Sequence, residues 1–112
     1  MNLEELRRVC NSLPYVTEDI KWENDLCFCI ADKLFCVTNL ESPLNISLKV
    51  KDEEFDELCS TNAIVPAPYL ARYKWISVRD VQRFSKKEWE KYIQQSYTLV
   101  KNKLPKSMLK KL

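Results

Sequence analysis

The stretch that decides the fold is LNISLKV, at residues 44–50. Its apolar and polar side chains alternate strictly: Leu44, Ile46, Leu48 and Val50 against Asn45, Ser47 and Lys49. This period of two is typical of a β-strand that buries one face and turns the other toward water. Strands of this kind occur in antiparallel sheets. The stretch therefore predicts a sheet with one face in contact with solvent.

The residues before this strand predict a hairpin. Leu26 to Ala31 is apolar on both sides of the expected strand, which indicates a central position. The pattern breaks at Ala31-Asp32 and resumes over Lys33 to Thr38. We expect a tight turn there, although a turn without glycine must rely on Asp or Asn to tolerate the strained angles.

Three helices are expected around these strands. The first spans residues 2–14, with an apolar stripe at helical spacing and a proline at its end. Asp52 is placed to cap the second, whose first turn is acidic, as the helix dipole favours. Ser85 and Glu88 form the capping box of the third, which Pro105 ends.

The order of elements defines the fold class. A proline-bearing loop at residues 65–70 leads into a further strand, Tyr73 to Val78. The order helix, four strands, helix, strand, helix contains no βαβ alternation. We therefore predict an α+β domain of two layers, an antiparallel sheet of about five strands packed by helices. A length of 112 residues fits one such domain.

Charge is divided unevenly along the chain. Residues 1–71 carry 6 Lys and Arg against 13 Asp and Glu, and residues 72–112 carry 12 against 3, so −7 and +9 sum to the formal +2. Fields act locally, within about 8 Å at physiological salt. The last third of the chain should therefore attract DNA or another polyanion, unless the acidic portion folds onto it.

The composition excludes several kinds of chemistry. The chain has no glycine, so it lacks the phosphate-cradling loops of common nucleotide-dependent enzymes. It has no histidine, so Ser-His and Cys-His nucleophile pairs and His-ligated zinc are excluded. The acidic run at residues 52–57 is interpreted as a solvated helix face. We expect a non-enzymatic protein with no cofactor and no catalytic or metal site.

The cysteines indicate a reducing compartment. Their number is odd and they include no CxxC pair, and we identify no export signal in the sequence. The five are Cys10, Cys27, Cys29, Cys36 and Cys59. No apolar run is long enough to cross a membrane. We expect a soluble, cytoplasmic protein with reduced thiols. A thiolate metal site at Cys27, Cys29 and Cys36 is a minor alternative.

The segment PAPYLARYKWISV, residues 66–78, interleaves aromatic rings with cations. Nucleic-acid surfaces use this combination, because Lys and Arg neutralise phosphate and ring faces stack bases. The alternative is packing: Trp75 and Ile76 seal the core while Arg72 and Lys74 lie over rings.

The same segment carries a family resemblance. The proline loop that runs into Arg72-Tyr73-Lys74-Trp75 and the stretch at residues 95–106 resemble the MmcQ/YjbR family, as do Cys10 to Pro14, Trp22 and the hairpin at residues 27–36. The resemblance covers the whole chain, residues 1–112. It implies a CyaY-like fold similar to type III secretion chaperones, and DNA binding through a double-wing arrangement of the sheet and its loops.

The chain also departs from the family. Many members place histidines in the proline loop and just before the tryptophan, where this chain has Tyr69-Leu70 and Tyr73-Lys74. Pocket chemistry that rests on those histidines is therefore not expected here. The family offers no catalytic residues to carry over.

Three functional hypotheses follow, one of them an enzyme or small-ligand binder, for which the sequence contains no recognisable constellation of catalytic groups. The first is a nucleic-acid-binding surface near residues 69–91, formed by Tyr69, Arg72, Tyr73 and Lys74 with support from Arg79, Arg83, Lys87 and Lys91. The alternative is a protein-interaction or chaperone-like module that receives a partner strand at the sheet, where residues 44–50 are one-sided, or that associates with a second copy through its opposite charges.

Overall fold

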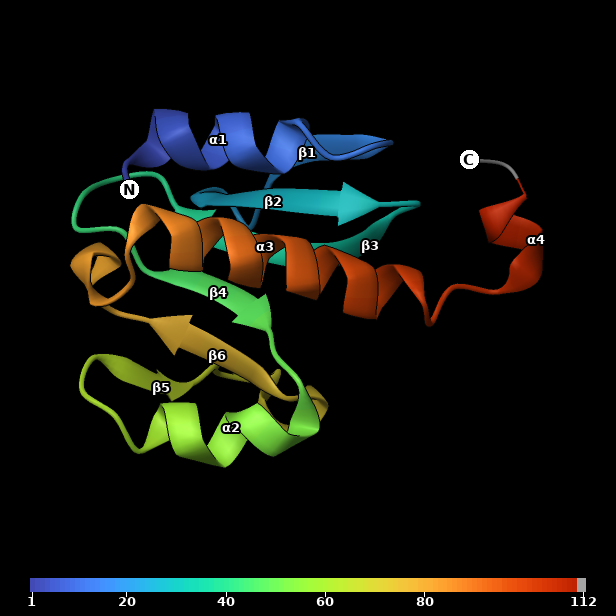
Figure 1. Ribbon diagram of the computed structural model, residues 1–112. Coiled ribbons are helices and arrows are strands. Elements are labelled where there is room, and N and C mark those ends of the chain that lie inside the picture. Colours follow the sequence, from blue (N-terminus) through green and yellow to red (C-terminus); the bar gives the residue numbers. More distant parts are fainter. Residues whose placement is uncertain (111–112) are drawn as a thin grey trace.

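The computed structural model describes residues 1–110 and confirms the predicted α+β class (Figure 1). Its elements are, in order, α1 (Leu3–Asn11), β1 (Val16–Lys21), β2 (Asp25–Ile30), β3 (Lys33–Asn39), β4 (Ile46–Lys49), α2 (Asp52–Cys59), β5 (Ile64–Pro66), the 3₁₀ turn η1 (Ala71–Tyr73), β6 (Trp75–Val78), the 3₁₀ turn η2 (Val81–Arg83), α3 (Lys86–Lys101) and α4 (Lys106–Leu109).

Four details differ from the prediction. The loop expected at residues 65–70 contains a short strand, β5, so the sheet has six strands. Tyr73 belongs to η1, and the following strand begins at Trp75. The second helix is capped at Lys51, whose backbone N–H donates to Glu54, and Asp52 is its first residue. The basic tail contains the short helix α4.

The sheet order is β1-β2-β3-β4-β6-β5, and every neighbouring pair is antiparallel. α3 crosses β2, β3 and β4, with α1 beside it near β1 and α2 against β5 and β6 (Figure 1). A hydrogen bond of 2.7 Å between Gln95 and Glu54 joins α3 to α2. All three helices therefore cover one face, and we call the opposite face of the sheet the open face.

The position of β4 limits the strand-addition hypothesis to the edges of the sheet. β4 is hydrogen-bonded to β3 on one side and to β6 on the other. A strand that is paired on both sides has no free edge to offer a partner. The edges of the sheet are β1 and β5.

The core lies between the helices and the sheet. One row of the register crosses four strands on the helix-covered face, through Phe28, Cys36, Leu48 and Ile76, and all four side chains are fully buried. Burial of each large apolar side chain contributes about 1.5–3 kcal/mol. The core fixes which side of every strand faces the helices.

The hairpin prediction is confirmed at Ala31-Asp32. Both residues have positive φ, 48° and 65°, as a two-residue turn of the primed type requires. The register after the turn contains a bulge: Phe28 pairs with Cys36 but Cys29 pairs with Leu34, so Phe35 has no partner on β2.

Ser96 of α3 completes the hydrogen bonding at this bulge. Its fully buried hydroxyl donates to the carbonyl of Phe35 at 2.6 Å and accepts the backbone N–H of Lys49 at 2.9 Å. The last paired residues of β3 and β4 at this end are Cys36 and Leu48. Ser96 therefore joins two strands where their own ladder ends, and it fixes α3 to both.

The cysteines all have free thiols in the described residues, and their faces are now defined. Cys27 and Cys29 lie on the open face, whereas Cys36 lies on the helix-covered face, where it neighbours Cys10 and raises the pKa of the Cys10 thiol. A thiolate site shared by Cys27, Cys29 and Cys36 is therefore wrong. Burial raises the pKa of Cys27 to about 11.

No helix within residues 1–110 has the length and apolar character needed to span a membrane.

Replacing Ser96 by Ala is expected to lower the free energy of unfolding by about 2–4 kcal/mol, because the buried carbonyl of Phe35 and N–H of Lys49 lose their partner. The matched control is Thr98→Ala on the exposed side of the same helix, for which we expect a change within about 0.5 kcal/mol. Urea denaturation of both variants measures the difference. Equal stabilities would contradict the assigned role of Ser96.

Candidate nucleic-acid interface

The structure divides the eight residues of the predicted site between two ends of the molecule. β6 has four residues and spans roughly 10–13 Å at the usual rise of a strand. Before it lie Tyr69, Arg72, Tyr73 and Lys74, and after it lie Arg79, Arg83, Lys87 and Lys91. α3 begins beside the second group and runs back toward the first (Figure 1). The predicted residues therefore do not form one patch.

Two members of the second group, Arg83 and Lys91, lie near the carboxylate of Glu88. The ammonium of Lys91 is 5.1 Å from the ring centre of Tyr92. Burial raises the pKa of Tyr92, and the carboxylates of Glu54 and Glu88 raise it further, while Arg83 opposes them. The surface around the first half of α3 thus carries both signs of charge, so the acidic and basic portions of the chain partly cancel here.

The first group places its tyrosine rings at the surface. Tyr69 is 98% exposed and Tyr73 is 49% exposed, and the guanidinium of Arg72 is 4.8 Å from the ring centre of Tyr73. Lys74 turns toward α2, with its ammonium 5.0 Å from the ring centre of Phe55. Trp75 is buried. The packing interpretation is therefore right for Trp75 and Ile76, which are buried, and for Arg72 and Lys74, which lie over rings. Tyr69 is left exposed, and Tyr73 is half exposed with Arg72 over its ring.

Three lysines that the sequence analysis did not select lie beside this group. They come from the start of β3, the end of β4 and the segment after α3, and they line a pocket of about 530 Å³. We call it the lysine pocket; it is lined by Lys33, Lys49 and Lys103 together with Leu34, Leu70, Tyr73, Trp75, Val100 and Leu104. None of its lining residues is acidic.

Lys49 is the unusual member of the pocket. It is only 6% exposed, and its ammonium donates to the carbonyl of Tyr73. Burial lowers the pKa of Lys49, and the neighbouring Lys103 lowers it further, while Asp52 opposes them. Within residues 1–110 the one ion pair joins Arg7 to Glu18, at 2.6 Å. Lys49 is therefore a buried cation without a counterion. The alternation of residues 44–50 had placed it on a water-facing side.

A second groove adjoins the lysine pocket on the open face. It has a volume of about 600 Å³ and a mainly apolar lining. We call it the aromatic groove; it is lined by Trp22, Asp25, Leu34, Val37, Ser47, Ala67, Pro68, Tyr69 and Leu70. Trp22 is 71% exposed. Leu34 and Leu70 line both cavities, so the two lie side by side.

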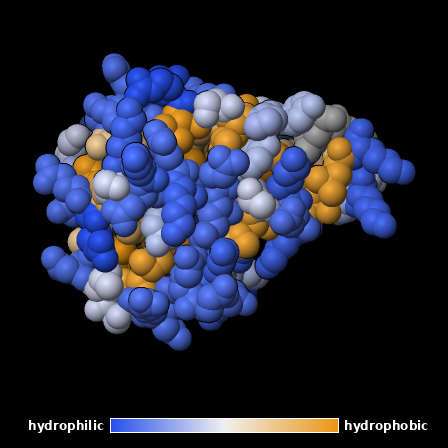
Figure 2. All heavy atoms as spheres, in the orientation of Figure 1, coloured by the Kyte–Doolittle hydropathy of each residue, from blue (hydrophilic) through white to orange (hydrophobic). Residues whose placement is uncertain are grey.

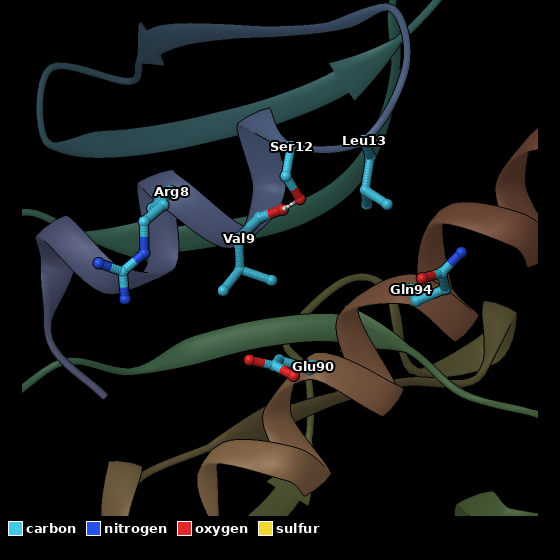
Figure 3. Close-up of a pocket in the computed structure, with 6 residues that line it drawn as sticks. All are labelled: Arg8, Val9, Ser12, Leu13, Glu90 and Gln94. Atoms are coloured by element: carbon cyan, nitrogen blue, oxygen red, sulfur yellow. Dashed lines mark hydrogen bonds between the residues drawn. The ribbon is translucent and has the colours of Figure 1, made fainter.

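The grooves on the helix-covered side contain charges of both signs. Figure 2 shows it as mostly hydrophilic, with small hydrophobic areas between the helices. The groove between α1 and α3 has a volume of about 300 Å³ and contains none of the predicted residues (Figure 3). It combines the cation Arg8 with the carboxylate Glu90, and the side chains of Val9 and Leu13 point toward α3. The candidate interface is therefore on the open face.

The fold and these cavities define a small α+β protein with one helix-covered and one uncovered sheet face. The YjbR family model matches residues 11–99. The chain belongs to the YjbR family, as the resemblance predicted.

Two solved structures share the fold. Deinococcus radiodurans protein DR2400, with a DUF419 domain, is 26% identical and superposes with a TM-score of 0.88; the match covers 98% of this chain and 86% of that one. A protein from Pseudomonas syringae is 21% identical, with a TM-score of 0.73 over 89% of this chain and 99% of that one. No curated protein matches the chain.

Replacing Lys49 by Met, which is of similar length, is expected to raise the free energy of unfolding at neutral pH by about 1 kcal/mol, because a buried unpaired cation is removed. The folded-state pKa of Lys49 lies below its usual 10.5, so the unfolded chain binds more protons between these two values. The difference in the free energy of unfolding between Lys49→Met and the wild-type protein should therefore shrink as the pH rises through this window.

Urea denaturation of both proteins at about pH 7 and about pH 10 measures this dependence. Because the two proteins share every other titrating group, the difference between them isolates Lys49. A wild-type protein that is more stable than Lys49→Met at neutral pH would contradict the absence of a counterion.

Proposed function

We propose that this protein binds nucleic acid, as a binding protein rather than an enzyme, through the open face at the end where β6 begins. The observation that supports this most strongly is that the lysine pocket and the aromatic groove lie side by side and share Leu34 and Leu70. Cations without carboxylate partners there adjoin exposed rings, which is the combination that single-strand-binding surfaces use.

The proposal revises the predicted set of residues. It keeps Tyr69, Arg72 and Tyr73 and adds Trp22 with the three lysines of the lysine pocket. Lys74 is kept only as a nearby positive charge, because its ammonium faces Phe55 of α2. Arg79, Arg83, Lys87 and Lys91 contribute only general attraction, because they lie at the other end of β6, where Glu88 is close to Arg83 and Lys91.

The exposed rings favour single strands over duplexes. Trp22 and Tyr69 line the same groove, and each has most of its surface exposed. A ring face can stack on a base only where the base is unpaired, and such stacking contributes about 1–3 kcal/mol per base. A duplex offers mainly its phosphates, which the lysines can contact in a salt-dependent way.

Replacing Tyr69 or Tyr73 by Ala is expected to weaken binding of a single-stranded oligonucleotide by about tenfold, because each variant removes one stacking ring. Lys91→Ala is the control at the distant end and should change the affinity less than about twofold, since its carboxylate surroundings already offset its charge. Fluorescence anisotropy with labelled single strands and duplexes, at about 50 and 200 mM salt, measures both effects.

Two results would contradict the proposal. One is an affinity for single strands that neither tyrosine variant changes. The other is a loss on Lys91→Ala as large as the loss on Tyr69→Ala, which would place the contact at the other end of β6.

A protein-interaction role remains a second candidate because of the edge strand β1. Ile20 is 55% exposed on it, and Trp22 follows it directly. Exposed edge strands are sites of strand addition. This candidate predicts self-association that Ile20→Lys abolishes, measured by light scattering, whereas nucleic-acid binding should be unaffected by that substitution.

A further inference from the structure

The lysine pocket contains the buried ammonium of Lys49. Neither the stacking of bases nor a general attraction of phosphates requires a buried cation. We propose that the lysine pocket binds a phosphate monoester, the group found at a phosphorylated strand end or on a nucleoside monophosphate. For a strand end the inference rests on the proposed function; for a free nucleotide it stands alone.

The fold brings three lysines from distant parts of the sequence to one pocket. Lys33 follows the tight turn of the hairpin, Lys49 ends β4, and Lys103 lies beyond α3. The backbone of Lys49 is fixed by Ser96, and its ammonium by the carbonyl of Tyr73. One cation is therefore held rigidly at the pocket, with two others beside it.

The hydrogen bonding of Lys49 leaves room for an anion. An ammonium group has three donors, and the described residues supply one acceptor, the carbonyl of Tyr73. The charged groups that act on Lys49 are the cations Lys103 and Lys74 and the carboxylate Asp52, and Asp52 does not line the pocket. An anion in the pocket would accept the remaining donors and offset the repulsion between Lys49 and Lys103.

The charge of the pocket favours a dianion. Three lysines with no lining carboxylate carry more positive charge than one internal phosphodiester can offset. A phosphate monoester carries a charge of about −1.5 to −2 near neutral pH and has three terminal oxygens. It therefore suits the pocket better than a phosphate within a strand.

The apolar residues indicate where the rest of the ligand lies. Leu34 and Leu70 separate the lysine pocket from the aromatic groove and line both. A nucleoside attached to the bound phosphate would cross these two leucines and place its base near Tyr69. Inorganic phosphate would lack this second contact.

The test compares three single strands of one sequence, with a 5′-phosphate, a 3′-phosphate or neither, by fluorescence anisotropy with the full chain. We expect at least one phosphorylated end to bind on the order of tenfold more tightly than the unphosphorylated strand. Lys49→Met should reduce this ratio to about one, and the matched control Lys87→Met should preserve it. The thermal unfolding of each variant verifies that it is folded.

Calorimetric titration with adenosine monophosphate and with inorganic phosphate separates the sources. We expect the nucleotide to bind more tightly than inorganic phosphate and to lose its affinity in Lys49→Met. Binding of the nucleotide without binding of any oligonucleotide would support the pocket and overturn the nucleic-acid function. Equal affinities of the three strands, with measurable binding, would overturn the pocket for strand ends and leave that function standing. Absence of binding in every titration would overturn both.

Discussion

The hydroxyl of Ser96, placed between the carbonyl of Phe35 and the N–H of Lys49, is the interaction on which the candidate site depends. It lies where the β3–β4 ladder ends, so without it two backbone groups would be buried and unpaired. It also fixes the position of α3 across the sheet. Because α3 is fixed, the segment after it brings Lys103 to the end of the sheet where β4 presents Lys49.

Because the chain has no glycine, residues with a Cβ adopt strained backbone conformations around the open face. Positive φ is adopted there by Trp22 and Tyr69, which line the aromatic groove, and by Lys74, which precedes the buried Trp75. Each such residue has a conformation that costs of the order of 1 kcal/mol for a residue with a Cβ. Glycine at these positions would relieve the strain but would remove the rings and the cation. The strain therefore accompanies the side chains that the proposed function uses.

Local patterns in the sequence were sufficient to predict much of the fold. The alternation at residues 44–50, the turn at Ala31-Asp32 and the capping box of Ser85 and Glu88 are all present in the structure. Each depends on residues a few positions apart. β5 was missed because it has three residues and includes a proline, so its pairing with β6 depends on tertiary contacts rather than on periodicity.

The candidate site was only half predictable for a related reason. Tyr69 and Tyr73 are close in sequence and remain close on the surface. Lys33, Lys49 and Lys103 are distant in sequence, and only the register of β3 and β4 and the path of α3 bring them together. The alternation of residues 44–50 predicted a water-facing side chain for Lys49. Such a pattern contains no information about distant segments, and in the structure residues 70–73 fold over the same face. The charge count grouped Arg79 with Lys74, although β6 separates them.

The most direct test of the account is a map of backbone amide chemical shifts, recorded by NMR while a 5′-phosphorylated single strand is added. The account predicts that the largest changes occur at Lys33, Lys49, Tyr69, Tyr73 and Lys103, on the open face. Changes concentrated at Arg79, Arg83, Lys87 and Lys91, or no changes at all, would contradict it.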